Sequence, residues 1–195
     1  MLQDLEQAEA ALAELHPQPF FIPLLSWAPI VAGAFAAMSK RHWIVTGPRS
    51  RIGAVLRGCA PERLLDQHTG ARPYKISPSS LHPANRALHA VGIAMATKQP
   101  TLCILGDAGL ANGAFWEALN IASLQQAPVV FLLIQQPQHG NLPMAQQYAP
   151  SPLNISPQFG LATYTCQATA SDVQNAVNEA CGVAQPALVL VQLEK

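Results

Sequence analysis

Two short polar segments of this chain could hold a metal ion between them. Asp107 lies in a glycine-containing turn, residues 106–109, and follows the apolar run at residues 102–105. Gln135 and Gln136 follow a second apolar run at residues 129–134. Carboxylate and amide oxygens are hard ligands that suit Mg²⁺, and the glycines let backbone N–H groups approach an anion. The stretch therefore predicts a site for a diphosphate group and its divalent cation.

The residues between these two segments have helical periodicity. Apolar side chains recur at helical spacing from residue 113 to residue 126, so the whole stretch is typical of a strand, a helix and a parallel strand. Ligands of such units bind beyond the carboxyl ends of the strands, where Asp107 and Gln136 would meet. In the alternative interpretation, Asp107 only caps the helix of an ordinary strand–turn–helix unit.

The rest of the chain repeats this alternation. We expect further helices at residues 1–15, 29–39, 52–57, 61–68 and 83–98, and one opened by a capping box at Ser171 and Gln174. We expect further strands at residues 42–46, 162–166 and 187–193, and a long surface loop at residues 140–157. The pattern predicts an α/β fold with a doubly wound, mostly parallel sheet. Residues 1–18 would form an amphipathic helix and linker, and residues 19–195 a single α/β domain.

The composition limits the classes of partner. Half of the 195 residues are hydrophobic, 11% are charged and the formal net charge is zero, which favours a large protein–protein interface and gives no basic surplus for nucleic acid. The apolar stretch at residues 20–38 is interrupted by Pro23 and Pro29, so we expect no membrane helix. The acidic start predicts no signal peptide. Four cysteines without CxxC spacing indicate reduced thiols and a cytoplasmic protein.

The metal-site stretch resembles the fingerprint of thiamine-diphosphate-dependent enzymes, which is Gly-Asp-Gly, a spacer and Asn-Asn. Here Gly106-Asp107-Ala108 is followed by 26 residues and then Gln135-Gln136. The resemblance implies that Asp107, the amide oxygen of Gln136 and the carbonyl of Gln138 are the Mg²⁺ ligands. It also implies a set of cofactor-binding positions in these segments: Gly106, Asp107, Ala108, Gly109 and Gln136. Ala in place of the last Gly and Gln in place of Asn depart from the pattern.

Other segments are similar to the alpha subunit of the decarboxylating component of 2-oxo acid dehydrogenase complexes. Its Tyr-Arg-x-His-Gly turn corresponds to residues 48–52, which implies that Arg49, helped by Arg51, binds the diphosphate. Its Gln-x-Pro-His-Ala-Val-Gly helix start corresponds to residues 86–92, which include His89. The catalytic residues stay undetermined, with His89 and His139 as candidates.

The resemblance implies a diphosphate- and Mg²⁺-binding subunit of a heteromeric enzyme that uses thiamine diphosphate on a small 2-oxo acid, with acyl or acyloin transfer. A pyrimidine-domain, beta-type chain would complete an α2β2 assembly, and an acyl carrier or lipoyl domain is a further expected partner. Two alternatives stay open. One is the N-terminal half of a transketolase-like enzyme. The other is a non-catalytic scaffold, favoured by Pro48, Ala108, Gln135-Gln136 and the missing histidine loop that follows the last strand in the family.

Overall fold

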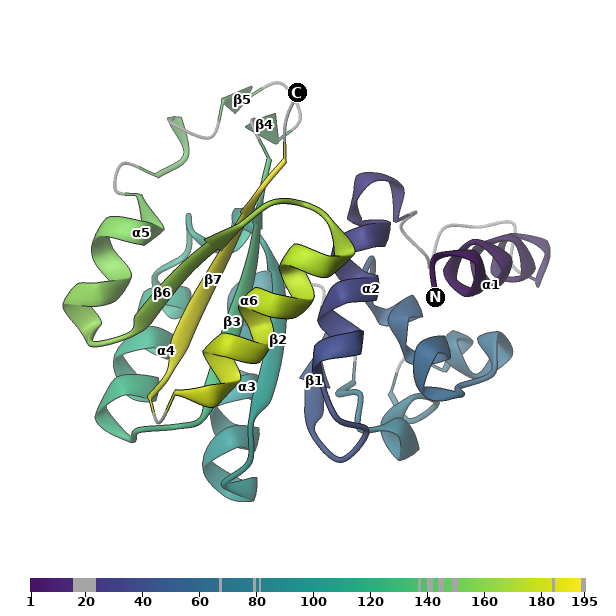
Figure 1. The fold of residues 1–195 in the computed structure, drawn as a ribbon, viewed down its shortest axis with the longest axis horizontal. Helices are drawn as coiled ribbons and strands as arrows, with labels where there is room; N and C mark the ends of the chain where they lie inside the picture. The colour runs from purple at the N-terminus through teal and green to yellow at the C-terminus, as the bar shows by residue number, and fades with distance from the viewer. Residues whose placement is uncertain are drawn as a thin grey trace.

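A parallel β-sheet organises the computed structural model, which describes residues 1–15, 24–66, 68–78, 80, 82–136, 138–139, 142–143, 146–148, 151–183 and 185–193. Its five strands have the spatial order β1-β2-β3-β7-β6, and every neighbouring pair is parallel (Figure 1). The strands are β1 (Trp43–Val45), β2 (Thr101–Gly106), β3 (Val129–Gln135), β6 (Ala162–Cys166) and β7 (Ala187–Gln192). The predicted strands and the predicted parallel sheet are confirmed.

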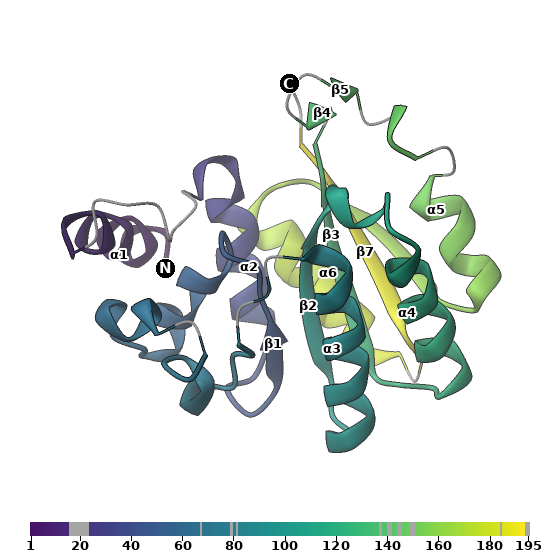
Figure 2. The same cartoon turned by 180° about the vertical axis from the view of Figure 1, so that it is seen from behind.

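Helices cover both faces of this sheet, as the two opposite views show (Figures 1 and 2). The α-helices are α1 (Leu2–Leu15), α2 (Ala28–Ala37), α3 (Pro83–Thr97), α4 (Gly113–Leu124), α5 (Pro152–Ile155) and α6 (Ala170–Gly182). Helices α2 and α6 pack together with one hydrophobic core, and α3 and α4 pack together with the other. The doubly wound α/β architecture predicted from the sequence is therefore confirmed.

The inner strands are continuous apolar runs because both of their faces are covered. Successive residues of β2 point alternately into the two cores: Leu102 and Ile104 into the α2–α6 side, Cys103 and Leu105 into the α3–α4 side. Leu105 pairs with Leu133 of β3 in the same register that pairs Gly106 with Ile134. This register brings the residues that follow β2 and β3 to the same edge of the sheet.

Several local predictions need correction. The expected helices at residues 52–57 and 61–68 are 3₁₀-helices, η2 (Arg51–Arg57) and η3 (Pro61–Leu65). Part of the expected surface loop is ordered as strand β5 (Leu142–Pro143), which pairs with β4 (Gln138–His139) just before the loop. Helix α5 and the start of the 3₁₀-helix η7 (Ser156–Phe159) also fall within it. The cap of α6 is Thr169, whose side chain accepts a hydrogen bond from the backbone N of Asp172 at 3.1 Å. The capping pattern thus begins two residues before Ser171.

Helix α1 forms as predicted and lies beyond α2 at the β1 end of the molecule (Figure 1). Its Leu5, Ala8 and Leu12 are buried in the same core cluster as α2. Residues 16–23 lie outside the described residues, and the proposed division of the chain near residue 18 stays a prediction. Among the described helices, none combines the length and apolar character needed to cross a membrane.

Candidate functional site

The carboxyl ends of β1, β2 and β3 meet at one edge of the sheet, where the residues that follow them line a pocket of about 260 Å³. We refer to it as the strand-end pocket. Its lining residues come from η1 (Leu25–Trp27), the turn after β1, the start of α3 and the ends of β2 and β3: Trp27, Gly47, Pro48, Arg49, Ser50, Pro83, Arg86, Gly106, Asp107, Ala108 and Gln136. Five predicted cofactor-binding residues are thus together: Arg49, Gly106, Asp107, Ala108 and Gln136.

Asp107 joins two of these strand ends directly. Its side chain is only 3% exposed, and its Oδ2 accepts a hydrogen bond of 2.6 Å from the backbone N of Gln136. Helix α4 begins six residues later at Gly113, and Asn112 caps it by accepting a hydrogen bond from the backbone N of Ala114. The alternative in which Asp107 is the helix cap is therefore wrong. The carboxylate is fixed at the floor of the pocket instead.

Arg49 lies over the indole ring of Trp27, with 5.1 Å between its Cζ and the ring centroid. Such a stacked guanidinium keeps its edge available for paired hydrogen bonds. Burial of the side chain lowers the pKa of Arg49. Trp27 also covers Gly106, because its Cη2 is 3.4 Å from the place where a Cβ at that position would lie. Trp27 was not among the predicted site residues, although an isolated tryptophan just before a predicted helix was a signal present in the sequence.

Arg86 is the second arginine of the pocket, and it was not among the predicted site residues. It comes from α3 and is only 6% exposed. Its guanidinium packs against Gly47, where an added Cβ would lie 1.7 Å from Nη1. Burial lowers the pKa of Arg86. The sequence did contain a signal. Arg86 is a charged residue within a predicted helix whose apolar composition indicates that the helix is buried.

Arg51 was expected to assist Arg49, but the structure does not bring it to the strand-end pocket. Its guanidinium donates from Nη1 to the carbonyl of Ser77 at 3.1 Å and from Nη2 to the carbonyl of Asp66 at 2.8 Å. Both bonds tie η2 to the segments that follow it, and the side chain is 5% exposed. Arg51 therefore stabilises the fold and does not line the strand-end pocket.

The other predicted residues are also away from the pocket or outside the description. Gly109 is buried against Pro83, whose Cβ is 3.3 Å from the position of an added Cβ. His89 lies on an exposed part of α3. Gln138 and His139 form β4, but the positions of their side chains lie outside what the structure describes. Neither histidine is brought to the pocket by a described contact.

The chemistry of the strand-end pocket suits an anion together with a hard cation. Guanidinium groups donate paired hydrogen bonds to phosphoryl oxygens, and the pocket contains Arg49 and Arg86. Carboxylate and amide oxygens are ligands that Mg²⁺ accepts, and Asp107 and Gln136 supply one of each. Over the described residues, no group of three or more His, Cys, Asp or Glu side chains could hold a metal.

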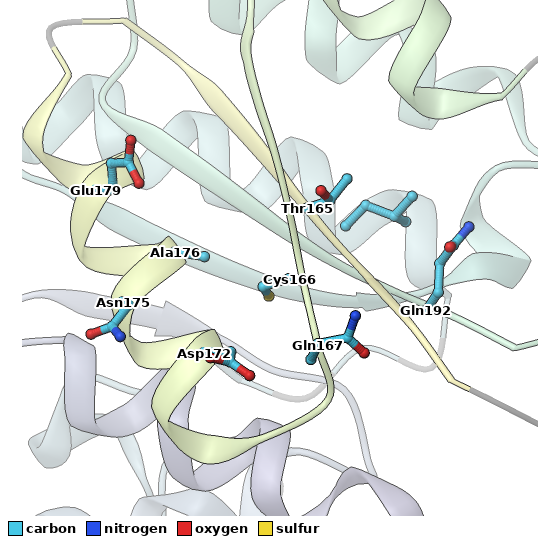
Figure 3. Close-up of a pocket in the computed structure, with 9 residues that line it drawn as sticks. Thr165, Cys166, Gln167, Asp172, Asn175, Ala176, Glu179 and Gln192 are labelled. Carbon is cyan, nitrogen blue, oxygen red and sulfur yellow. The ribbon is translucent and has the colours of Figure 1, made fainter.

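A larger pocket of about 640 Å³ lies between α6 and the ends of β6 and β7 (Figure 3). Asp172 and Glu179 of α6 line it with Cys166 of β6, and none of its lining residues is a Lys or Arg. Two carboxylates would repel a diphosphate group. Burial and the nearby Asp172 raise the pKa of Cys166 to about 11, so its thiol is protonated at neutral pH and is a poor nucleophile. The strand-end pocket is therefore the better candidate.

Comparisons with known proteins identify the family of the chain. Residues 28–136, more than half of the chain, match the family described as "Dehydrogenase E1 component". The chain is 31% identical over 127 residues to the pyruvate dehydrogenase E1 component subunit alpha of Mycoplasma genitalium, covering 58% of this chain and 35% of that protein. It is 28% identical over 129 residues to the 3-methyl-2-oxobutanoate dehydrogenase subunit alpha of Mycobacterium tuberculosis, covering 60% of this chain and 35% of that protein.

The fold has solved relatives as well. The X-ray structure of a protein described as a thiamin diphosphate-dependent enzyme, from Mycobacterium smegmatis, superimposes with a TM-score of 0.57. The alignment covers 84% of this chain and 31% of that one at 16% sequence identity, which shows a shared fold. The chain spans about a third of the length of the relatives it matches. The matched residues contain the ends of β1, β2 and β3 that form the strand-end pocket, and the chain belongs to the dehydrogenase E1 component family.

Proposed function

We propose that the strand-end pocket binds the diphosphate group of thiamine diphosphate together with Mg²⁺. In this proposal Arg49 donates to the phosphoryl oxygens, and Asp107 and Gln136 are the metal ligands. The observation that carries it is the meeting of these three side chains in one pocket at the ends of adjacent parallel strands. Ligands of open parallel sheets bind at this edge. The carbonyl of Gln138 stays a proposed third ligand.

The residues of this chain would bind and orient the cofactor. When bound, thiamine diphosphate supplies the carbanion stabilisation that decarboxylation of a 2-oxo acid requires. Asp107 is positioned for its role before any ligand binds, because the backbone of Gln136 fixes one carboxylate oxygen. Trp27 and Pro48 give the pocket an apolar wall that limits the access of water to the anion. A catalytic acid or base is not identified among the described residues of the pocket.

A partner chain would complete the site. Pockets that enclose a drug-sized ligand have volumes of about 300–1,000 Å³, so a pocket of about 260 Å³ suits the diphosphate end of the cofactor better than the whole molecule. Leu25, two residues before Trp27, is 73% exposed and offers an apolar contact beside the pocket. We therefore propose a pyrimidine-domain, beta-type partner in an α2β2 assembly that acts on a small 2-oxo acid, with transfer of the acyl group to an acyl carrier or lipoyl domain.

The compartment is proposed on the basis of cysteine chemistry. Cys59 and Cys103 are free and buried, and Cys166 and Cys181 are free and partly buried. Reduced thiols are typical of cytoplasmic proteins.

Membership of the dehydrogenase E1 component family favours this enzyme type over a transketolase-like half-subunit. The alternative of a non-catalytic scaffold differs from the proposed function in that it predicts no cofactor binding, which titration calorimetry can measure.

Titration calorimetry on the chain, co-purified with a beta-type partner, tests the proposal. The unmodified complex should bind thiamine diphosphate in the presence of Mg²⁺. Asp107→Ala should weaken this binding at least about tenfold, since hydrogen-bonded or metal-bound charged groups contribute more than 1.4 kcal/mol. Glu117→Ala, on the exposed side of α4, removes the same charge away from the pocket and is the control. A complex that binds no cofactor, or an Asp107→Ala complex that binds it normally, would favour the scaffold.

A further inference from the structure

Three arginines of this chain are almost fully buried, and they differ in what their guanidinium groups contact. Arg51, Arg57 and Arg86 are 5%, 6% and 6% exposed. In all three, Nε lacks a hydrogen-bond partner among the described residues. Arg51 donates from both Nη atoms to two carbonyls, and Arg57 donates to three. A buried cation is normally stabilised by such contacts, so these two arginines belong to the fold.

Arg86 has no corresponding contact within the described part of the chain. None of the described carboxylates forms an ion pair with it, and no described group satisfies its Nε. Its guanidinium lies against Gly47 at the wall of the strand-end pocket, in the space that any larger residue at position 47 would occupy. A desolvated, uncompensated cation is costly to the folded protein. Its position at the pocket indicates that an anionic ligand compensates it.

We propose that Arg86 binds the phosphoryl oxygens of the diphosphate together with Arg49, so that this chain retains diphosphate binding when Mg²⁺ is removed. The inference rests on the proposed function, and it concerns which residues hold the anion. In a site with one arginine, the metal must neutralise most of the ligand's charge. Here two guanidinium groups with up to five donors each supply both charge and hydrogen bonds.

The sequence around Arg86 supports a role particular to this chain. In the family pattern quoted above, the corresponding helix start has Gln at the position of Arg86. The departure exchanges a neutral amide for a cation at the wall of the pocket. Of the other departures, Ala108 and Gln136 lie on the proposed metal side of the same pocket, and Pro48, where the family has Tyr, also lines it. The anion side has thus lost a tyrosine and gained a charge, and the proposed metal side has changed an amide ligand.

Titration of the full chain with inorganic diphosphate, in buffer with EDTA and in buffer with Mg²⁺, tests this inference. Unmodified protein should bind diphosphate in EDTA within about tenfold of its affinity in Mg²⁺. Arg86→Gln, which restores the family residue, should bind at least about tenfold more weakly in EDTA, as expected for lost charge-assisted hydrogen bonds. Gly47→Ala should weaken binding in EDTA in the same direction, because the added Cβ would displace Nη1.

The control is Arg72→Gln, which removes an exposed cation of the same chain segment outside the strand-end pocket. It should bind diphosphate as unmodified protein does. The inference fails if unmodified protein needs Mg²⁺ for binding, or if Arg86→Gln and Arg72→Gln bind equally well in EDTA. Binding in Mg²⁺ that Asp107→Ala abolishes would then leave the proposed function standing. Absence of binding in both buffers would overturn the two proposals together.

Discussion

Replacing Arg86 with methionine should make the unliganded protein more stable. The substitution keeps an unbranched side chain that fills the space of the stem. It removes the guanidinium of a residue that is 6% exposed and has no ionic partner among the described residues. Burial lowers the pKa of Arg86, which means that the charged guanidinium destabilises the folded state. This destabilisation is fully present at every pH below the lowered pKa, including neutral pH. Replacement of buried ionic groups by apolar ones stabilises proteins by about 1–4 kcal/mol. Because this guanidinium borders a pocket, we expect a gain of about 1 kcal/mol, near the lower limit.

Arg57→Met is the matched control, since Arg57 is equally buried. Its guanidinium donates to the carbonyls of His42 at 2.8 Å, Tyr74 at 3.0 Å and Ser39 at 3.1 Å. Hydrogen bonds to charged groups contribute about 1.5–3 kcal/mol each, so the loss of three should lower the free energy of unfolding by roughly 3 kcal/mol or more. In thermal denaturation followed by circular dichroism, the Tm of Arg86→Met should therefore be higher than that of unmodified protein, and the Tm of Arg57→Met should be lower.

The expected shifts are measurable. For a domain of this length, 1 kcal/mol changes Tm by about 2–4 °C, so Arg86→Met should melt a few degrees higher than unmodified protein. In saturating inorganic diphosphate, unmodified protein should instead melt at a higher temperature than Arg86→Met. A ligand stabilises the folded state according to its affinity, and Arg86→Met has lost a proposed contact with the anion. If Arg86→Met instead melts lower, as Arg57→Met is expected to, Arg86 is a structural residue that stabilises the unliganded fold, and an anionic ligand is not needed to explain its burial.

Two further predictions concern the metal side of the site and a core thiol. Gln136→Asn should retain Mg²⁺-dependent binding of thiamine diphosphate because it keeps an amide oxygen, whereas Gln136→Leu should weaken it strongly; equal calorimetric affinities would show that Gln136 is not a ligand. Cys103 should stay unmodified by a thiol reagent at pH 8 in the folded protein and react in denaturant, because burial raises the pKa of Cys103 to about 12. Rapid labelling of Cys103 in the native protein would contradict its burial.

The sequence was sufficient to predict the sheet because each strand of the central unit is an unbroken apolar run that ends in polar residues. β2 and β3 are covered on both faces, so their composition indicates their position without knowledge of the packing. The convergence of Asp107 and Gln136 followed from the geometry of parallel strands alone. The central part of the fold and the meeting of the two proposed metal ligands are local consequences of one strand–helix–strand unit, and such units are recognisable in sequence.

The arginines of the proposed anion side were harder to predict because their positions depend on local geometry and long-range packing. Arg49 and Arg51 are two residues apart in the same turn, and similar roles were expected for both. Arg51 begins the 3₁₀-helix η2, where side chains repeat every three residues, so the two guanidinium groups point to different surroundings. One stacks on Trp27, and the other bonds to backbone carbonyls. Only the packing of η1 and α3 against the strand ends shows which arginine lines the pocket.

The zero net charge also conceals how the site is assembled. Ten of the eleven Lys and Arg residues lie between Lys40 and Lys98, and residues 99–193 contain four carboxylates and no Lys or Arg. The strand-end pocket is formed where these two parts of the chain meet, so its two arginines come from the basic part and its carboxylate comes from the acidic part. A diphosphate with a divalent cation needs both signs of charge within a few ångströms. The charges of this chain are separated along the sequence, and folding brings them together at the ends of β1, β2 and β3. Both signs of charge are therefore present in the pocket proposed for the diphosphate and its cation.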